Sequence, residues 1–267
     1  MKKTPTVKKH KKALTVLITG STSGIGLGIA KTFAKEGHNI IFNGLEKEGP
    51  AIAAKIAKEF KVKTLYSSAN VLKADEIDAM IAEGEKKFGS IDVLINDAGI
   101  QHVAPIEDFP NATWDAIIGI NLSASFHTSK AVWKGMKKQK FGRIINIASA
   151  HGLVASEFKS AYVAAKHGLV GLTKVLALEG ATFGITANSI CPGYVKTPLV
   201  DKQIADQAKA HGLSKEKVVS DVMLAPQAIK EFVDIEAIAA LAIFLSSNNA
   251  KMITGAALSI DGGWTAQ

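Results

Sequence analysis

Short apolar runs alternate with longer segments in which apolar residues recur at helical spacing. Continuous apolar runs bounded by glycine or polar residues are typical of buried parallel strands, and periodic segments without proline are typical of helices. The pattern predicts strands at Ala13 to Thr19, Asn39 to Asn43, Val62 to Ser67, Ile91 to Asn96, Arg143 to Ala148, Thr186 to Ile190 and Ala256 to Ile260. It predicts helices at Ile29 to Glu36, Gly49 to Phe60, Lys73 to Phe88, Ala112 to Lys138, Ala161 to Leu178 and Asp234 to Ser246.

These elements follow one another as strand, helix, strand, with short connections. Such alternation is typical of one parallel sheet with helices on both faces. We therefore predict an α/β fold, a single doubly wound sheet of the Rossmann type, in one domain over residues 13–267. Residues 197–230 are helical in pattern but more polar, with interruptions at Gly212 and Pro226, which predicts a helical flap that closes over a substrate.

A glycine-rich turn follows the first predicted strand, with glycines at positions 20, 24, 26 and 28. Glycine lets the backbone approach a pyrophosphate, and the N-terminus of the following helix offers free N–H groups and a positive partial charge. The order of strand, glycine-rich turn and helix therefore favours nucleotide binding. The spacing Gly-x-x-x-Gly-x-Gly differs from the common dinucleotide pattern, so a purely structural turn is the open alternative.

The end of the second strand leaves the type of nucleotide open. An acidic residue at that point favours NAD, because it holds the ribose hydroxyl, and an arginine favours NADP. Here the strand ends in Asn43, with Glu46 only nearby, and no arginine follows. Lys47 is the one cation placed to hold a 2′-phosphate.

The stretch Ser149 to Lys166 joins a predicted strand to a predicted helix. Tyr162 and Lys166 are four residues apart, which puts both side chains on one helix face. A free tyrosine has a pKa near 10, and a neighbouring ammonium lowers that value, so the pair suits proton transfer. Ser149, at the strand end, adds a second donor for the same oxygen. The rival interpretation is an ordinary helix with a surface tyrosine and lysine.

Net charge separates the first residues from the rest of the chain. The chain carries a net charge of +8, of which six charges belong to lysines within residues 1–12. These residues are expected to form a basic, mobile tail rather than a nucleic-acid-binding arm. Arg143 is the one arginine, so an anionic substrate must be held by Lys, His, Gln or backbone N–H groups.

Composition favours a protein that works in a reducing compartment, without a membrane span. Hydrophobic residues make up 47% of the chain, but no apolar run reaches the roughly 18 residues of a membrane span. No secretory signal is predicted. The single cysteine, Cys191, excludes an internal disulfide and is expected to be buried.

Two residues outside these motifs have an expected place. Asn121 lies between Ile120 and Leu122 in the middle of a predicted helix, which indicates a buried, hydrogen-bonded side chain. Trp264, near the C-terminus, belongs to the core, to a subunit interface or to the wall of a pocket. The first two places are favoured.

Four motifs occur in the order found in the short-chain dehydrogenase/reductase family, which the chain resembles from about Ala13 onward. They are Thr19-Gly-x-x-x-Gly-x-Gly26, Asn96-Asp-Ala-Gly99, Ser149 with Tyr162-x-x-x-Lys166, and Pro192-Gly193. Longer stretches, including Ser149 to Ala155 and Asp261 to Trp264, are similar to the members of the family that oxidise D-3-hydroxybutyrate. The resemblance implies a cytoplasmic homotetramer that interconverts D-3-hydroxybutyrate and acetoacetate with NAD, without a metal, nucleic acid or membrane as partner.

The resemblance also implies the role of each site residue. Tyr162 would be the general acid-base, Lys166 would lower its pKa and hold the nicotinamide ribose, Ser149 would steady the substrate oxygen, and Asn121 would anchor a water that links Lys166 to solvent. Together with Tyr162 and Lys166, the nucleotide would be bound by Gly20, Thr22, Ser23, Gly24, Ile25, Gly26, Asn70, Val71, Asp97, Ala98, Gly99, Pro192, Gly193, Val195 and Thr197. With Ser149 and Tyr162, the substrate would be bound by Gln101, His151, Lys159 and Gln203.

Three positions depart from the family pattern, and one rival activity stays open. Asp97 replaces a common asparagine, Asn70 stands where an aspartate commonly meets the adenine amine, and Tyr194 stands where this type of enzyme often has tryptophan. The alternative is a reductase of the same fold that acts on a 3-oxoacyl thioester with NADPH. A small pocket ringed by Gln101, His151, Lys159 and Gln203 argues against a long acyl carrier.

Overall fold

One parallel sheet in the order β3-β2-β1-β4-β5-β6-β7 runs through the computed structural model, which describes residues 13–266. The strands are β1 (Thr15–Ile18), β2 (Asn39–Asn43), β3 (Thr64–Ser67), β4 (Val93–Asn96), β5 (Gly142–Ile147), β6 (Ile185–Pro192) and β7 (Ala257–Ile260). The strand order reverses between β1 and β4, and the carboxyl ends of both strands border the crevice at this point. The predicted α/β fold with a doubly wound sheet is confirmed, and the predicted basic tail lies outside the described residues.

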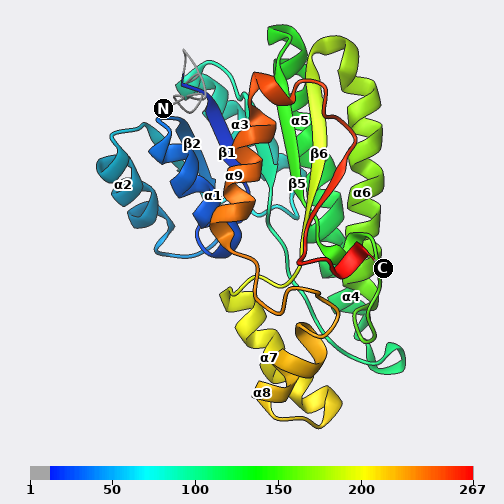
Figure 1. Cartoon of the computed structure of the whole chain (residues 1–267). Helices are drawn as coiled ribbons and strands as arrows, with labels where there is room; N and C mark the ends of the chain where they lie inside the picture. Colours follow the sequence, from blue (N-terminus) through cyan, green and yellow to red (C-terminus); the bar gives the residue numbers. More distant parts are fainter. Residues whose placement is uncertain (1–12, 267) are drawn as a thin grey trace, which may run out of the picture.

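Helices cover both faces of the sheet (Figure 1). One face carries α1 (Gly24–Lys35), α2 (Gly49–Phe60) and α9 (Ile235–Ser246), and the other carries α3 (Ala74–Phe88), α5 (Ala124–Gln139) and α6 (Ser160–Gly180). The core is accordingly divided in two by the sheet. Phe33 of α1 is fully buried on the first face, and Met136 of α5 is fully buried on the second.

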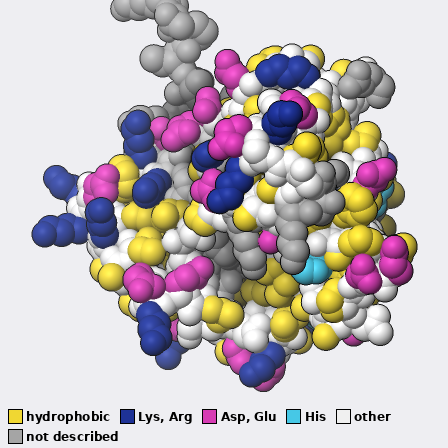
Figure 2. All heavy atoms as spheres, turned by 90° about the horizontal axis from the view of Figure 1, so that it is seen from below, with side chains coloured by type: hydrophobic (Ala, Val, Ile, Leu, Met, Phe, Trp, Pro, Cys, Tyr) yellow, Lys and Arg dark blue, Asp and Glu magenta, His cyan; other side chains and the backbone are white. Residues whose placement is uncertain are grey.

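The segment predicted as a flap forms a separate helical group below the carboxyl end of the sheet (Figure 1). It contains α7 (Pro198–His211), α8 (Lys215–Lys217) and a π-helical turn at Val218–Met223. Gly212, with a φ of 63°, ends α7, as its position in the sequence predicted. Seen from below, the surface mixes basic, acidic and hydrophobic side chains rather than presenting charges of one sign (Figure 2).

Two predicted helix boundaries were wrong. The first helix starts at Gly24 rather than Ile29, so the last glycines of the turn are helical. A Cβ on Gly28 would meet Ile235 of α9, which explains why a glycine is needed inside this helix. The helix predicted over residues 112–138 is two helices, α4 (Asn111–Ile118) and α5, joined by a π-helical turn at Gly119–Ser123.

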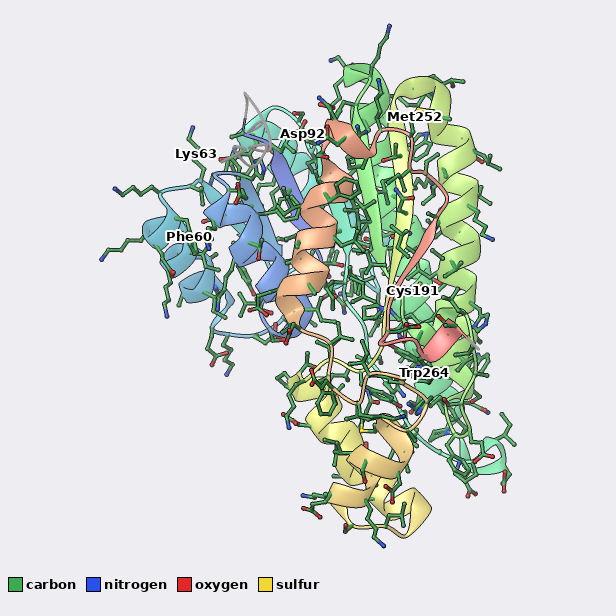
Figure 3. All side chains as sticks on the ribbon, viewed as in Figure 1. Phe60, Lys63, Asp92, Cys191, Met252 and Trp264 are labelled. Carbon is green, nitrogen blue, oxygen red and sulfur yellow. The ribbon has the colours of Figure 1, made fainter. Side chains whose placement is uncertain are left out.

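No helix within residues 13–266 is long and apolar enough to cross a lipid bilayer. Cys191 is fully buried, and burial raises the pKa of its thiol to about 11. Figure 3 places this side chain within the sheet, far from the surface-exposed Met252. The prediction of a buried cysteine is confirmed.

Candidate active site

A cavity of about 360 Å³ opens at the carboxyl edge of the sheet, where most of the predicted site residues meet. From the predicted nucleotide set it is lined by Gly20, Ser23, Gly24, Ile25, Asn70, Val71, Asp97, Ala98, Gly99, Pro192, Gly193, Val195 and Thr197. From the predicted catalytic and substrate sets it is lined by Gln101, Ser149, His151, Lys159, Tyr162, Lys166 and Gln203. Thr22, Gly26 and Asn121 stand behind this wall rather than in it.

The glycine-rich turn forms one end of the cavity. Gly20 has a φ of 65°, and a Cβ on it would lie 2.9 Å from Ala98 Cα, so this position requires glycine. Gly24, with a φ of 55°, opens α1 at the cavity surface. A Cβ on Gly26 would lie 2.6 Å from a carboxylate oxygen of Asp97, which accepts a hydrogen bond from the Gly26 N–H. The remaining first-turn N–H groups face the place where an anion would bind.

Acidic and amide side chains border this end of the cavity. Glu46 lines it and accepts a hydrogen bond from the Thr22 hydroxyl, while the neighbouring Lys47 does not reach the lining. Asn70 lines it too, but its Oδ1 accepts a hydrogen bond of 3.0 Å from the Leu72 N–H. That oxygen therefore holds its own loop in shape.

Tyr162 and Lys166 lie on one face of α6, as their spacing predicted. The Lys166 ammonium lies 5.5 Å from the centroid of the Tyr162 ring and donates a hydrogen bond of 2.7 Å to the Ile147 carbonyl at the end of β5. Ser149, two residues beyond that carbonyl, makes a hydrogen bond with the Tyr162 hydroxyl. The strand end and the first turns of the helix thus bring the three side chains together.

The pKa of Tyr162 does not follow the sequence-based expectation. Burial raises it to about 12, the hydrogen bond with Ser149 lowers it, and the charge of Asp97 raises it. Burial lowers the pKa of the Lys166 ammonium, against the opposing charge of Asp97, and burial raises the pKa of the Asp97 carboxyl. Without a further cation beside it, the phenol of Tyr162 stays neutral.

Asn121 supports the site from behind. Its side chain is 1% exposed, and its amide binds both backbone groups of Ile100, accepting from N–H at 2.9 Å and donating to C=O at 3.0 Å. The π-helical turn that contains Asn121 points its amide toward the loop after β4. The predicted buried, hydrogen-bonded role is confirmed, whereas the predicted water contact remains a prediction.

Lys159 lies at the opposite end of the cavity and is 3% exposed. It is the N-cap residue of α6, and its side chain makes no capping hydrogen bond to that helix. The residue before it, Phe158, has a φ of 64°, a strained conformation for a bulky side chain. Burial lowers the pKa of Lys159 to about 7, and within residues 13–266 no ion pair joins this cation to a carboxylate.

Uncharged polar groups surround the Lys159 end of the cavity. The Gln101 Nε2 atom is buried and has no hydrogen-bond partner among the described residues, and Gln203 is 6% exposed. His151 connects two hydroxyls, with Nδ1 3.4 Å from Ser149 Oγ and Nε2 2.9 Å from Ser156 Oγ. Burial lowers the pKa of His151 well below its usual value, so the ring is neutral.

Trp264 forms part of the cavity wall, the alternative that the sequence disfavoured. It stacks on Tyr194 with 5.5 Å between ring centroids and an angle of 12°. Figure 3 shows Trp264 at the end of the sheet that faces the helical segment of α7 and α8. At 7% exposed it is also a core residue.

A buried chain of polar side chains behind the cavity was not predicted. Asn96 donates to Asn146 Oδ1 at 2.8 Å, Asn146 donates to Thr173 Oγ1 at 2.8 Å, and Thr173 shares a 2.8 Å hydrogen bond with Ser189. The residues come from β4, β5, α6 and β6, and all are at most 4% exposed. The polar residues at matching positions of neighbouring apolar strands were the available signal, together with the helix position of Thr173.

Known proteins share both the sequence and the fold. A model of the short chain dehydrogenase family matches residues 14–208. The D-beta-hydroxybutyrate dehydrogenases of Rhizobium meliloti and Cupriavidus necator are 54% and 53% identical to the chain, over 95% of it and 99% and 98% of their own lengths. A 3-oxoacyl-acyl-carrier-protein reductase of Staphylococcus epidermidis is 36% identical over 92% of the chain and 97% of its own length.

A solved structure is similar throughout. A variant of actinorhodin polyketide ketoreductase with NADPH has a TM-score of 0.91 and 32% identity, and the match covers 96% of this chain and 98% of that one. Fold, family match and identities together define the chain as an oxidoreductase that uses a nicotinamide cofactor. It belongs to the short-chain dehydrogenase/reductase family, so the resemblance inferred from the four motifs is confirmed.

The lowered pKa of Lys159 predicts how stability depends on pH. Below about pH 7 the buried ammonium destabilises the folded state in full. As the pH rises from about 7 toward the unfolded value of 10.5, the folded state loses a proton that the unfolded state keeps, so the free energy of unfolding increases. Compared with Lys159→Met, the wild type should therefore gain stability between pH 7 and 9, by at most about 1.4 kcal/mol per pH unit.

Urea unfolding of the wild type and of Lys159→Met at pH 7 and at pH 9 measures this change in the free energy of unfolding. Lys174→Met, on an exposed position of the same helix, is the control and should keep the pH dependence of the wild type. A pH dependence that is unchanged in Lys159→Met would contradict the burial of a titrating ammonium.

Proposed function

We propose that the protein interconverts D-3-hydroxybutyrate and acetoacetate with NAD as cofactor. One observation carries the proposal: a buried cation, Lys159, without an acidic partner among the described residues, closes the end of the cavity opposite the glycine-rich turn. Tyr162 lies in the lining of the same cavity. The names and identities of the two hydroxybutyrate dehydrogenases support the same substrate.

A substrate carboxylate fits the Lys159 end in charge and in hydrogen bonding. A buried ammonium without a counter-ion is unfavourable, and an anion beside it offsets that cost. The unpartnered Nε2 of Gln101 is a second donor for the carboxylate, and Gln203 is a third. Both ring nitrogens of His151 have hydroxyl partners, so we assign it to holding Ser149 rather than to charge neutralisation.

A nicotinamide dinucleotide fits the glycine end. The close approach at Gly20 and the first-turn N–H groups of α1 suit its pyrophosphate. Glu46, rather than Lys47, lines the cavity beyond the second strand. A carboxylate at this point accepts hydrogen bonds from ribose hydroxyls and repels a 2′-phosphate, which supports NAD rather than NADP.

The positions of the site residues support the following reaction. When bound, an oxidised nicotinamide would supply the acceptor for the hydride on the carbon that bears the 3-hydroxyl, and it would bring a positive charge to the site. Tyr162 takes the hydroxyl proton in the same step and returns it in the reduction direction. Ser149 holds the substrate oxygen next to the phenol, and Lys166 supplies a cation below the ring. Because burial disfavours the phenolate, these cations together have to offset it.

The remaining expectations are part of the same proposal. The helical segment with α7 and α8 is assigned to closing over the substrate, since Thr197, Val200 and Gln203 carry side chains from its first turns into the cavity lining. We also propose a cytoplasmic homotetramer that acts on a small 3-hydroxy or 3-oxo acid rather than on nucleic acid or a membrane. Asn121 is assigned to positioning the loop after β4, with the water link to Lys166 as a further part of the proposal.

A substrate panel tests the function. The panel contains both enantiomers of 3-hydroxybutyrate, its methyl ester and a 3-oxoacyl thioester, each with the NAD and NADP forms of the cofactor. We expect D-3-hydroxybutyrate with NAD to give the highest kcat/KM, and the ester to fall by about tenfold or more because a charged hydrogen bond is lost. Faster turnover of the thioester with NADPH would overturn the proposal in favour of the rival activity.

Tyr162→Phe tests the proton transfer. Loss of the general acid-base should reduce kcat by about 10²–10⁴-fold, while the affinity for NAD changes little. Steady-state kinetics measures the loss of kcat, and the quenching of tryptophan fluorescence by NAD measures the affinity for the cofactor, so the two effects are separated. Appreciable turnover by this variant would show that another group moves the proton.

Glu46→Gln tests the choice of cofactor. Removing the exposed carboxylate should lower the ratio of kcat/KM for NAD to that for NADP by about fivefold, the size of an exposed charge interaction of about 1 kcal/mol. Glu48→Gln, also exposed but outside the cavity lining, is the matched control and should leave the ratio unchanged. An equal ratio in wild type and Glu46→Gln would remove Glu46 from the explanation.

A further inference from the structure

The Tyr194 hydroxyl is in direct contact with the cation at the substrate end of the cavity. Lys159 donates a hydrogen bond of 2.5 Å to Tyr194 Oη, and its ammonium lies 4.8 Å from the centroid of the same ring. Both residues are at least nine-tenths buried and both line the cavity. An ammonium has three protons to donate, so a single bond to the phenol leaves two for a ligand.

Tyr194 is itself held from several sides. Its ring stacks on Trp264 and meets the His151 ring edge-on, with 6.2 Å between centroids. Its backbone N–H donates to Gln227 Oε1 at 3.2 Å, and its carbonyl accepts from the Val233 N–H at 2.8 Å. The phenol oxygen therefore has a fixed place, whereas the long Lys159 side chain gains a fixed place only through its partners.

The same phenol lies beside the helical flap. Burial raises the pKa of Tyr194 to about 12, and the side chain of Gln207 on α7, which is 2% exposed, partly opposes that rise. The Gln207 Nε2 atom itself is buried and has no hydrogen-bond partner among the described residues. The phenol thus lies between the N-terminus of α6, which carries Lys159, and the helix that covers the cavity.

We infer that Tyr194 is a positioning residue for carboxylate recognition: its hydroxyl fixes the Lys159 ammonium so that the two remaining N–H groups meet a carboxylate in the cavity. The inference rests on the proposed function, since it concerns the same substrate site. A phenylalanine would keep the stacked ring and lose this bond. The lysine would then lose a fixed direction for its cation, and carboxylate binding would weaken without loss of the fold.

Binding of butyrate and butyramide tests the inference without turnover. The two probes have similar size and differ in charge, and calorimetry in the presence of NADH measures both on the full-length protein. We expect Tyr194→Phe to bind butyrate about tenfold more weakly than the wild type, the size of one lost hydrogen bond to a charged group, and to bind butyramide within a factor of two. Tyr66→Phe, which removes another hydrogen-bonded hydroxyl, is the control and should keep the wild-type affinity for butyrate.

The outcomes are distinguishable. Equal weakening for both probes would assign Tyr194 a purely structural role and overturn the inference, as would unchanged butyrate affinity or a wild type that binds no butyrate. Selective loss of butyrate supports it, even when 3-hydroxybutyrate is not turned over, a result that would refute the proposed function alone. If Tyr194→Phe does not fold, Tyr194→Trp, which removes the hydroxyl and keeps an aromatic ring against Trp264, is measured in its place.

Discussion

The site depends on one interaction, the hydrogen bond from the buried ammonium of Lys166 to the last carbonyl of β5. This hydrogen bond fixes the first turns of α6 against the carboxyl edge of the sheet. Since Tyr162 precedes Lys166 by one helical turn, the same bond aims the phenol at the cavity. Burial makes the cation costly, and Asp97 partly offsets that cost through its charge. One contact between a helix and a strand therefore sets both the position of the phenol and the charge beside it.

A polar framework makes this contact rigid. The buried Asn146 and Thr173 side chains join β5 to α6 through a direct hydrogen bond, and Asn121 fixes the loop after β4 through both of its amide atoms. Each of these polar groups has a hydrogen-bond partner, so burying it costs little free energy. The hydrogen bonds in turn fix the positions of the segments that they join.

Sequence patterns predicted the parts of the fold that depend on local chemistry. The apolar runs gave the strands nearly as observed, and the motif residues Ser149, Tyr162 and Lys166 meet in one cavity because parallel strands end at one edge. The start of α1 was missed because glycine normally ends a helix, whereas here Gly28 lies against a helix some 200 residues later in the chain. Contacts between distant segments of this kind leave no local pattern.

The electrostatics of the site were less predictable for the same reason. The spacing of Tyr162 and Lys166 suggested an acidic phenol, but burial, which a sequence does not give, dominates its pKa. The contacts of Lys159 with Tyr194 and of Thr22 with Glu46 join residues 35 and 24 positions apart. Neither pair has a characteristic spacing, so only the folded arrangement reveals them.

The pH at which Tyr162 ionises, with and without bound NAD, is the decisive measurement for the proposed proton transfer. The ultraviolet difference spectrum of tyrosinate, taken between wild type and Tyr162→Phe, follows this one phenol through a pH titration. We expect Tyr162 to ionise at a pH near 12 in the protein alone and at a distinctly lower pH when NAD is bound, because the nicotinamide cation would join Lys166 beside the phenol. An ionisation that NAD leaves unchanged would contradict the role of Tyr162 as the acid-base group.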